Sequence, residues 1–273
     1  MPELPEVETT ARALRPLIIG RSVVDVWNNW PPTIVTPSFS HFKSRICGQQ
    51  FIDLTRRGKY LLFQLQYDTL IIHLKMSGHL AVVPRQASVH KHVHTIFELD
   101  NNCQLRFRDQ RKFGRVYLVS DPEQVVGKLG PEPLAEAFTP EVLRTRLQNR
   151  KRALKPLLLD QTFVAGIGNI YADEALFYAG LHPQRTADSL TDTEIIRLHA
   201  AIQKVLQMGI EREGASIDLY VKPDGSKGDM QNAVAVFRRT DMPCYVCGTP
   251  IRRIRLGGRS THFCATCQPL AVK

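Results

Sequence analysis

The chain has 273 residues, a formal net charge of +10 and a sequence pI near 9.5. Apolar residues make up 43% and charged residues 23%, which is ordinary for a globular protein of one to three domains. No apolar run approaches the ~20 residues that a membrane span needs, and the acidic, proline-containing start MPELPEVETT is unlike a signal or transit peptide. We therefore expect a cytoplasmic protein that has no membrane association.

The first 120 residues have the pattern of one helix followed by many short strands. Pro5 begins a segment in which Val7, Ala11, Leu14 and Ile18 fall on one helical face. From about residue 22 to 120, β-rich runs such as KYLLFQLQ and TLIIHLKM alternate with Gly, Asp, Asn and Pro. This spacing predicts an antiparallel two-sheet sandwich with the helix packed at its start.

The pattern becomes helical after the Gly-Pro-Glu-Pro sequence at residues 130–133. Apolar spacing there predicts three helices, over residues 140–160, 169–179 and 192–212. The last one opens with Thr191 and Glu194, which are spaced as in a capping box. The polar, glycine-rich stretch 222–231 predicts a mobile loop.

Basic residues gather in three tracts. Residues 101–119 carry five basic side chains against one acid, and residues 141–155 and 239–273 each carry six against one. Apolar residues are interleaved in every tract, so these are not disordered basic tails. Clustered Lys and Arg can replace the counterions of a phosphate backbone. A basic but solvated surface is the alternative, and the clustering favours a nucleic-acid partner.

Four of the six cysteines form two matched turns, Cys244-x-x-Cys247 and Cys264-x-x-Cys267, separated by sixteen residues. Two such turns complete a tetrahedral four-sulfur site, which leaves no position for water and is therefore structural. A redox pair or disulfides would be the alternative. Between the turns, IRRIRLGGRSTHF predicts a hairpin with a Gly-Gly turn and Arg259 near its tip. Cys47 and Cys103 are predicted to be buried structural thiols.

A glycine turn precedes the second predicted helix. Gly166 and Gly168 let the backbone approach a partner closely, and the helix starting at Asn169 offers free N–H groups and a positive dipole end. Alone, this pattern is compatible with a simple helix cap. Basic residues expected on the preceding helix favour phosphate binding: Arg150, Lys151, Arg152 and Lys155.

The segments PELPEVE, DQRKFG, GIGNIYADEALF and GGRSTHFCATC occur in this order in one chain. Together they resemble the bacterial formamidopyrimidine-DNA glycosylase family, over essentially the whole sequence. The resemblance implies an α+β protein: an N-terminal β-sandwich with a packed helix, then an all-α helix-two-turn-helix region and a four-cysteine zinc finger. The implied boundaries are a catalytic β-sandwich at 1–130, a helix-two-turn-helix DNA-binding domain at 131–222, a lesion-capping loop region at 223–234 and the zinc finger at 235–269.

The family consists of bifunctional DNA glycosylases and AP lyases of base excision repair. Its members excise oxidised purines (8-oxoguanine and formamidopyrimidines) and cleave the strand by β,δ-elimination. The resemblance therefore implies that double-stranded DNA containing a damaged base is the partner, that one structural Zn²⁺ is the cofactor, and that the protein is a monomer. It also implies a location in the bacterial cytoplasm, associated with the nucleoid through DNA.

Four residues match the family's catalytic positions. Pro2, exposed when the initiator methionine is removed, matches the nucleophile, and Glu3 matches the acid beside it. Lys59 matches a lysine that assists elimination, and Arg259 matches a finger arginine that grips flanking phosphates and is assigned to the final elimination. At pH ~7.5 roughly a third of an α-amino group is neutral against about 0.1% of a lysine, so a terminal amine is the better nucleophile.

Seven further residues match positions that contact DNA. Met76, Arg111 and Phe113 match a wedge that fills the hole left by a flipped nucleotide, whereas Met76 and Phe113 taken alone would be core residues. The others match contacts along the strand: His73, His92, Arg150 and Asn169. One stretch departs from the family: Asp218-Leu219-Tyr220 stands where a basic–acidic pair usually precedes the aromatic residue of the lesion-capping loop.

Two alternatives remain open at the level of sequence. An endonuclease VIII-type relative would share the proline chemistry but favour oxidised pyrimidines; the start PELPE rather than PEGPE, and the Met/Arg/Phe set, argue against it. A catalytically silent, damage-sensing DNA-binding protein would need none of Pro2, Glu3 and Lys59.

Overall fold

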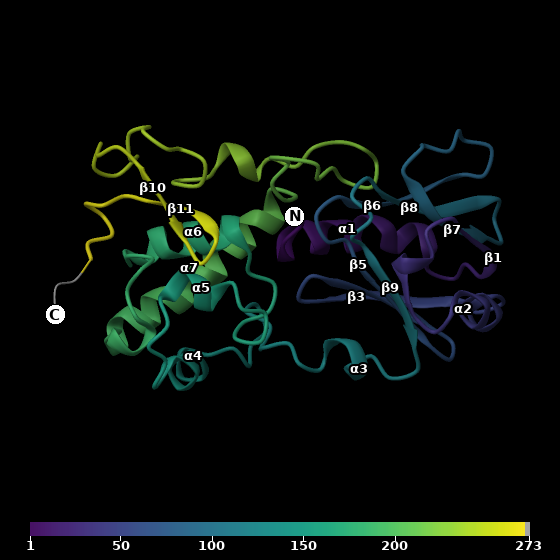
Figure 1. Ribbon diagram of the computed structural model, residues 1–273, viewed down its shortest axis with the longest axis horizontal. Coiled ribbons are helices and arrows are strands. Elements are labelled where there is room, and N and C mark those ends of the chain that lie inside the picture. Colours follow the sequence, from purple (N-terminus) through teal and green to yellow (C-terminus); the bar gives the residue numbers. More distant parts are fainter. Residues whose placement is uncertain (271–273) are drawn as a thin grey trace. The chain divides into compact units, whose positions relative to one another are not determined.

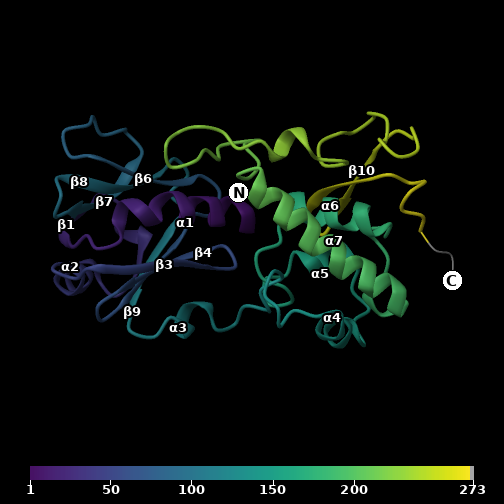
Figure 2. The ribbon, with the colours of Figure 1, turned by 180° about the vertical axis from the view of Figure 1, so that it is seen from behind.

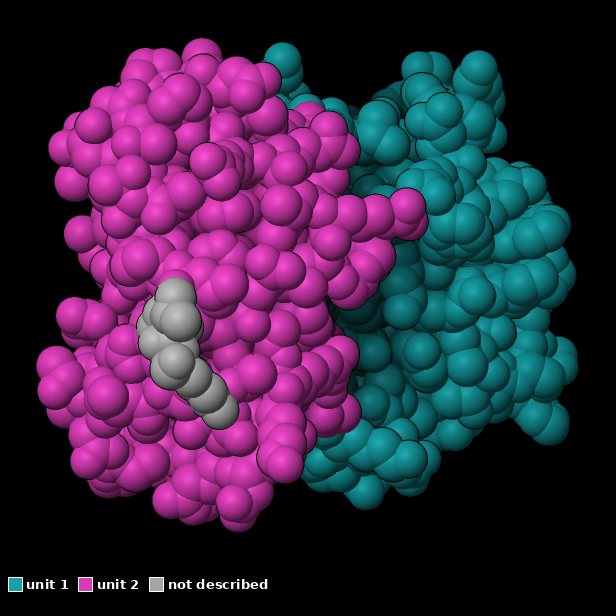
Figure 3. Space-filling model, turned by 60° about the vertical axis from the view of Figure 1, so that its left-hand side comes forward, with its two compact units in different colours: residues 1–128, 212–229 teal, residues 129–211, 230–273 magenta. Residues whose placement is uncertain are grey.

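The computed structural model describes residues 1–270, which form two compact units. The first unit contains residues 1–128 and 212–229, and the second contains residues 129–211 and the chain from residue 230 onward (Figure 3). The polar stretch that follows the long helix therefore belongs with the strands. Within the described residues, no helix combines the length and the apolar character that crossing a membrane requires.

Two sheets build the first unit (Figures 1 and 2). One has five strands in the order β2-β9-β5-β4-β3, and the other has four in the order β1-β7-β8-β6. The strands are β1 (Val23–Asn28), β2 (Ile34–Thr36), β3 (Phe51–Arg57), β4 (Tyr60–Leu65), β5 (Thr69–His73), β6 (Gly78–Pro84), β7 (Val93–Leu99), β8 (Cys103–Asp109) and β9 (Arg115–Val119).

The core of this unit lies between the sheets and includes the first helix, α1 (Leu4–Ile18). Val7, Leu14 and Ile18 on α1 are fully buried, in one hydrophobic cluster with Phe63 of β4 and Phe97 of β7. The predicted helix and its apolar face are confirmed. Burial of these side chains, at roughly 25 cal/mol per Å² of apolar surface, holds α1 against the sandwich.

We expected an antiparallel sandwich, but one strand pair is parallel. β2 pairs with β9 in parallel, in a short ladder at the edge of the five-stranded sheet. Its three residues follow a 3₁₀ turn, Pro31–Thr33, which brings the chain to this edge. Two short helices were also not predicted: α2 (Phe39–Ile46) and α3 (Glu123–Val126). Each is too short for helical periodicity to stand out in the sequence.

The second unit is helical, with a two-stranded hairpin near the end of the chain. Its helices are α4 (Pro140–Leu147), α5 (Leu154–Leu158), α6 (Asn169–Ala179) and α7 (Asp192–Glu211), with 3₁₀ turns at Ala187–Ser189 and Met230–Asn232; the hairpin strands are β10 (Arg252–Leu256) and β11 (Arg259–Phe263). The capping box of α7 is confirmed: Thr191 N–H donates to the Glu194 carboxylate (2.9 Å), and Glu194 N–H donates to Thr191 Oγ1 (3.3 Å).

The single helix predicted over residues 140–160 is wrong. α4 ends at Leu147, and Asn149 then adopts a left-handed conformation (φ 60°), which asparagine tolerates better than most residues. Pro156 explains why the helix cannot run through. It has no N–H to donate and its ring would clash inside a helix, but it fits the first turn of a new one, α5.

Candidate active site and nucleic-acid interface

The start of α1 is fixed by buried carboxylates. Glu3 is the N-cap residue and forms a capping box with Glu6: the Glu6 carboxylate accepts the Glu3 N–H (2.8 Å), and the Glu3 side chain bonds back to the N–H of Glu6. Glu6, only 1% exposed, also accepts the N–H of Ala215 (2.7 Å). Pro2 is buried beside them, whereas Met1 is 41% exposed. Glu6 therefore ties the predicted nucleophile's helix to the returning segment, residues 212–229.

Lys59 lies at the tip of the β3–β4 hairpin, after Gly58 (φ 55°), and is buried. Two ion pairs show how α1 runs along β3: Arg15–Asp53 (2.8 Å) and Glu8–Arg56 (3.1 Å). Seven helical residues rise by about 10 Å, as do three strand residues, so helix and strand advance together. The start of α1 is therefore at the end of the helix that points toward the hairpin end of β3.

His73 is the residue opposite Tyr60 in the β4–β5 pair, and their rings meet edge to face with centroids 4.5 Å apart. Burial lowers the pKa of His73 to about 3, and the charges of Lys75 and Lys59 act in the same direction. The imidazole is therefore neutral at pH 7. Its Nδ1 accepts the N–H of Lys75 (2.9 Å), which leaves Nε2–H as a hydrogen-bond donor.

Two loops bring the predicted wedge residues together. Asp109 is buried at the end of β8, and its carboxylate accepts the N–H groups of Arg111 (3.2 Å) and Gly114 (2.6 Å) and the hydroxyl of Ser77. Ser77 Oγ in turn accepts the Arg111 N–H (3.0 Å), so the loop that carries Met76 is fastened to the loop that carries Arg111. The sequence reasoning missed Ser77 and Asp109 because short polar residues beside turns are common.

Arg111 and Phe113 lie next to each other at the tip of the second loop. The Arg111 guanidinium stands over the Phe113 ring, 4.8 Å from its centroid. Phe113 is 46% exposed and Met76 is half-buried, so neither is a core residue. The exposed ring of Phe113 is accessible to a partner, as the predicted wedge role requires.

A concavity of about 340 Å³ lies beside these loops, lined by Ser77, His90, Lys91, His92, Arg108, Gln110 and Leu219. His92, a predicted DNA contact, is half-buried there, and its ring is 5.4 Å from that of His90. Leu219 comes from the returning segment and is 49% exposed. Leu219, one of the residues that depart from the family pattern, therefore lines the same hollow as His92.

In the second unit, the glycine turn is held together by one side chain. Gln161 accepts the N–H of Gly166 (2.9 Å) and donates to the carbonyl of Ile167 (2.8 Å), while Gly166 adopts a φ of 86° that favours glycine. Asn169 is the first residue of α6. Its Oδ1 is buried and has no hydrogen-bond partner among residues 1–270. The first residue of α6 therefore has a buried acceptor oxygen that no described residue satisfies.

The predicted hairpin is confirmed, with Gly257 and Gly258 both at positive φ and Arg259 directly after the turn. Arg259 is opposite Leu256, and Arg255 is opposite Ser260. Because neighbouring residues of a strand point to opposite faces, Arg259 and Arg255 project from different sides of the hairpin.

A buried ionic network joins this hairpin to α5 and α6. Lys155 Nζ lies 2.7 Å from an Asp173 carboxylate oxygen with both side chains fully buried, and it donates to the Ser260 carbonyl (2.6 Å). The second Asp173 oxygen accepts the N–H (3.0 Å) and Nδ1–H (3.1 Å) of His262. The network sets how β11, which begins at Arg259, lies against α6, which begins at Asn169.

Replacement of Lys155 by alanine is expected to cost about 3–5 kcal/mol in the free energy of unfolding, because Asp173 would keep a buried charge without its cation. Arg152→Ala is the control. Arg152 pairs with Asp160 in a partly exposed ion pair, and its loss should cost under about 1 kcal/mol. Urea unfolding of the full chain measures both. Equal midpoints for the two variants would contradict this role of Lys155.

Each of the three basic tracts contains a basic side chain that is buried and not available to a partner. Arg106 is buried and donates to backbone carbonyls, and Lys155 and Arg239 are buried as well. Arg150 to Arg152 lie in the loop between α4 and α5, not on a helix as expected, and Lys155 faces the interior. Lys273 lies outside the described residues. Within the second tract, Arg150 and Lys151 stay exposed and have no acidic partner in the described chain.

The four paired cysteines form a metal centre. Their sulfur atoms lie within 4.8 Å of one another, with separations such as Cys247–Cys264 at 3.4 Å and Cys244–Cys267 at 3.9 Å. Tetrahedral Zn²⁺ with Zn–S bonds of about 2.3 Å needs sulfur separations of about 3.8 Å, far from the ~2.05 Å of a disulfide. The N–H groups of Val246 and Cys267 point at the sulfurs of Cys244 and Cys264, as expected for thiolate ligands.

The zinc module packs on the helical unit. Phe177 of α6 shares a buried cluster with Val236, Cys244, Ile251 and Cys264. Glu174 on the same helix accepts the N–H groups of residues 235–237 at 2.7–3.0 Å. The metal centre is therefore a structural part of the second unit.

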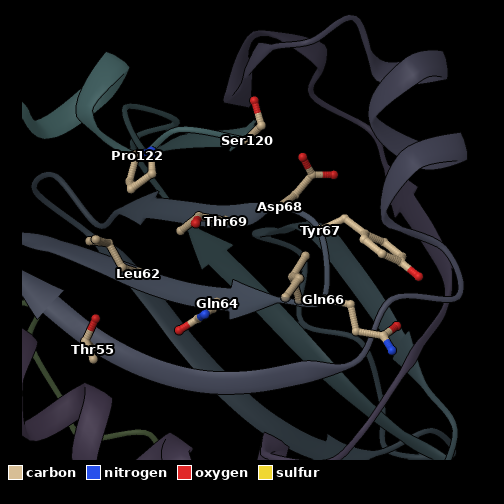
Figure 4. Close-up of a pocket in the computed structure, with 10 residues that line it drawn as sticks. Thr55, Leu62, Gln64, Gln66, Tyr67, Asp68, Thr69, Ser120 and Pro122 are labelled. Carbon is tan, nitrogen blue, oxygen red and sulfur yellow. The ribbon is translucent and has the colours of Figure 1, made fainter.

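Another concavity, of about 410 Å³, lies around the β4–β5 turn (Figure 4). Figure 4 shows Tyr67, Asp68 and Thr69 there with Ser120 and Pro122. None of the predicted catalytic or DNA-contact residues lines this hollow.

The fold and the four-cysteine centre define the class: a protein with a β-sandwich unit and a helical unit that carries a zinc finger. Three sequence profiles match consecutive parts of the chain: the formamidopyrimidine-DNA glycosylase N-terminal domain (residues 1–116), the H2TH domain of the same family (129–221) and a zinc finger found in FPG and IleRS (243–270).

Full-length relatives agree with these profiles. The chain is 47% identical to a formamidopyrimidine-DNA glycosylase of Symbiobacterium thermophilum, covering 99% of this chain and 90% of the relative, and 43% identical to that of Bacillus subtilis, covering 98% and 99%. The solved structure of Lactococcus lactis Fpg with DNA containing an abasic site superposes with a TM-score of 0.92 at 38% identity, covering 98% of this chain and 99% of that one. The chain belongs to the formamidopyrimidine-DNA glycosylase family.

Proposed function

We propose that this protein is a DNA glycosylase and AP lyase that removes oxidised purines from double-stranded DNA. The observation that carries the proposal is the match of the chain to the family over its whole length, with Pro2 and Glu3 buried at the start of α1 and Lys59 buried at the tip of the β3–β4 hairpin. Relatives bound to DNA containing Fapy-dG or an abasic site support the substrate class.

Pro2 is the proposed nucleophile, acting after removal of Met1. Its neutral secondary amine forms a bond to the sugar C1′ while the glycosidic bond breaks, and opening of the sugar ring leaves a cationic iminium. Loss of a proton from C2′ sends electrons toward the iminium and expels the 3′-phosphate; a second elimination expels the 5′-phosphate. Glu3 handles protons at the deoxyribose, and Lys59 assists elimination from the hairpin tip.

The remaining residues bind and deform the duplex in this proposal. Neutral His73 offers Nε2–H to a phosphate, and Asn169 and Arg259 bind phosphates from the second unit. His92 and Arg150 contact the strand. Met76, Arg111 and Phe113 fill the space of the flipped nucleotide; Arg111 can pair with the orphaned cytosine.

We propose the domain division expected from the sequence: catalytic sandwich at 1–130, helix-two-turn-helix domain at 131–222, capping loop region at 223–234 and zinc finger at 235–269. The capping loop would close over the lesion, with Asp218 and Leu219 affecting lesion choice more than strand cleavage. The protein would act as a monomer on chromosomal DNA in the bacterial cytoplasm.

A matched set of lesion duplexes tests the proposed function. We expect excision of 8-oxoguanine opposite cytosine to exceed excision of thymine glycol by more than about tenfold, because a site built for one base's hydrogen-bonding edge rejects another. Faster excision of the pyrimidine lesion would favour the endonuclease VIII-type alternative. Tight binding of lesion DNA without any cleavage would mean a damage-sensing protein instead.

Glu3→Gln separates base excision from strand cleavage. The glutamine can keep the N-cap hydrogen bond, but it cannot supply a proton, so we expect 8-oxoguanine excision to fall about 100- to 10,000-fold. Cleavage of a preformed abasic site should fall much less, since no base has to leave. Single-turnover rates on both substrates measure the difference. An equal loss on both substrates would show that Glu3 does not act in base release.

A further inference from the structure

A residue outside the site described above contacts the wedge loop, residues 110–114. Lys112 lies between Arg111 and Phe113 in that loop and has a left-handed conformation (φ 58°). Its neighbours on either side meet each other through the Arg111–Phe113 contact. The Lys112 ammonium lies over the ring of Trp30 instead, 4.2 Å from the ring centroid. The loop is thus held on its other side by an aromatic face.

Trp30 is attached to a stiff part of the sandwich. The N–H of Asn29 donates to the His94 carbonyl (3.1 Å), and the N–H of Trp30 donates to Asn28 Oδ1 (3.0 Å). Pro31 and Pro32 follow directly, with φ angles that are fixed by their rings. The backbone that carries the indole is therefore held at the ends of β1 and β7, independently of the loop that the indole contacts.

The Trp30 ring interacts through its π face, whereas its N–H makes no hydrogen bond within the described residues. Trp30 Nε1 is buried and lacks a hydrogen-bond partner in the chain as far as residue 270. A buried indole usually finds a partner for this group, and leaving it unpaired is unfavourable. The ring is kept in this place where its π face receives the Lys112 ammonium, a contact strongest for tryptophan.

We propose that Trp30 is a positioning residue that acts through Lys112 to hold the wedge loop ready to enter the duplex. The inference rests on the proposed function, because it assumes that Arg111 and Phe113 fill the hole left by the flipped base. Asp109 fixes the base of the loop, and the Trp30–Lys112 contact fixes its apex. Without the Trp30–Lys112 contact, the wedge loop would have to become ordered each time the protein meets a lesion.

Trp30→Leu and Lys112→Gln should each lower kcat/KM for 8-oxoguanine in a duplex by about two- to five-fold, the size of one exposed cation–π contact. The double variant should be no worse than the poorer single one. The conservative variants Lys112→Arg and Trp30→Phe keep a cation or an aromatic ring at the contact, so they should retain part or most of the wild-type kcat/KM. Cleavage of an abasic site in single-stranded DNA, where no opposite strand leaves a hole, should not change. Lys128→Gln, an exposed charge change in the same unit, is the activity control.

Fluorescence tests the contact independently of activity. The chain has two tryptophans, so Trp27→Phe leaves Trp30 as the only indole. In this background Lys112→Gln should shift the emission, and Lys128→Gln should not. Unchanged emission would overturn the contact. Unchanged duplex activity of Trp30→Leu in an otherwise active enzyme, or an equal loss on single-stranded abasic DNA, would overturn the positioning role. Failure of the wild-type protein to excise 8-oxoguanine would instead refute the proposed function, with the emission arm still deciding the contact.

Discussion

A protein with one residue inserted ahead of Pro2, or with Met1 retained, is expected to lose borohydride trapping on a duplex that contains 8-oxoguanine opposite cytosine. Borohydride reduces the iminium between enzyme and sugar to a stable amine and so leaves a covalent protein–DNA adduct. An amide nitrogen shares its lone pair with the carbonyl and is not a nucleophile. Base excision should fall by several orders of magnitude with it, as when other covalent catalysts lose their nucleophile.

Pro2→Gly is the matched comparison, since it keeps a terminal amine and removes only the ring. Its trapping should weaken without disappearing. The blocked protein should still bind lesion DNA, because Met1 is already 41% exposed in the structure and α1 is anchored by Glu3 and Glu6. Full trapping by the blocked protein would mean that a lysine is the nucleophile, with Lys59 the first suspect.

Cys264→Ser is expected to remove the zinc and abolish DNA binding while the sandwich stays folded. A four-thiolate site contributes roughly 10–16 kcal/mol to the folding of its module at pH 7, far more than so small a module gains from its own core. Cys264 is buried in the cluster with Phe177, so loss of the metal would also disturb the face of α6. The β10–β11 hairpin would lose the support that holds Arg259.

Elemental analysis and DNA binding measure this prediction together. The wild-type protein should hold one zinc per chain and Cys264→Ser none, with sheet circular dichroism retained. Cys47→Ser is the control. Cys47 is the C-cap residue of α2 and belongs to the first unit, whereas the cysteine cluster belongs to the second. Active wild-type protein without stoichiometric zinc would contradict a structural zinc site.

Local patterns were enough to predict much of this fold. The apolar face of α1, the capping box of α7, the Gly257-Gly258 hairpin and the cysteine cluster each depend on residues close together in sequence. The hairpin turn has two glycines, which both adopt positive φ, and the two cysteine pairs have the same spacing. Such signals need no knowledge of tertiary packing.

Contacts between distant segments could not be predicted. Nothing in the sequence pairs Lys155 with Asp173 and Ser260, and so Lys155 was grouped with exposed basic residues. The same limit applies to Glu6 and Ala215, which are 209 positions apart. Charge counts along the chain report composition but not exposure, because a basic side chain can be satisfied by backbone carbonyls, as Arg106 is.

Identification of the residue that carries the reduced sugar tests the central claim most directly. The adduct trapped by borohydride can be digested with trypsin, its DNA removed, and the modified peptide sequenced by mass spectrometry. The account predicts the modification on the amino-terminal nitrogen of Pro2, in the peptide of residues 2–12. Modification of Lys59, in a peptide of residues 58–75, would contradict it.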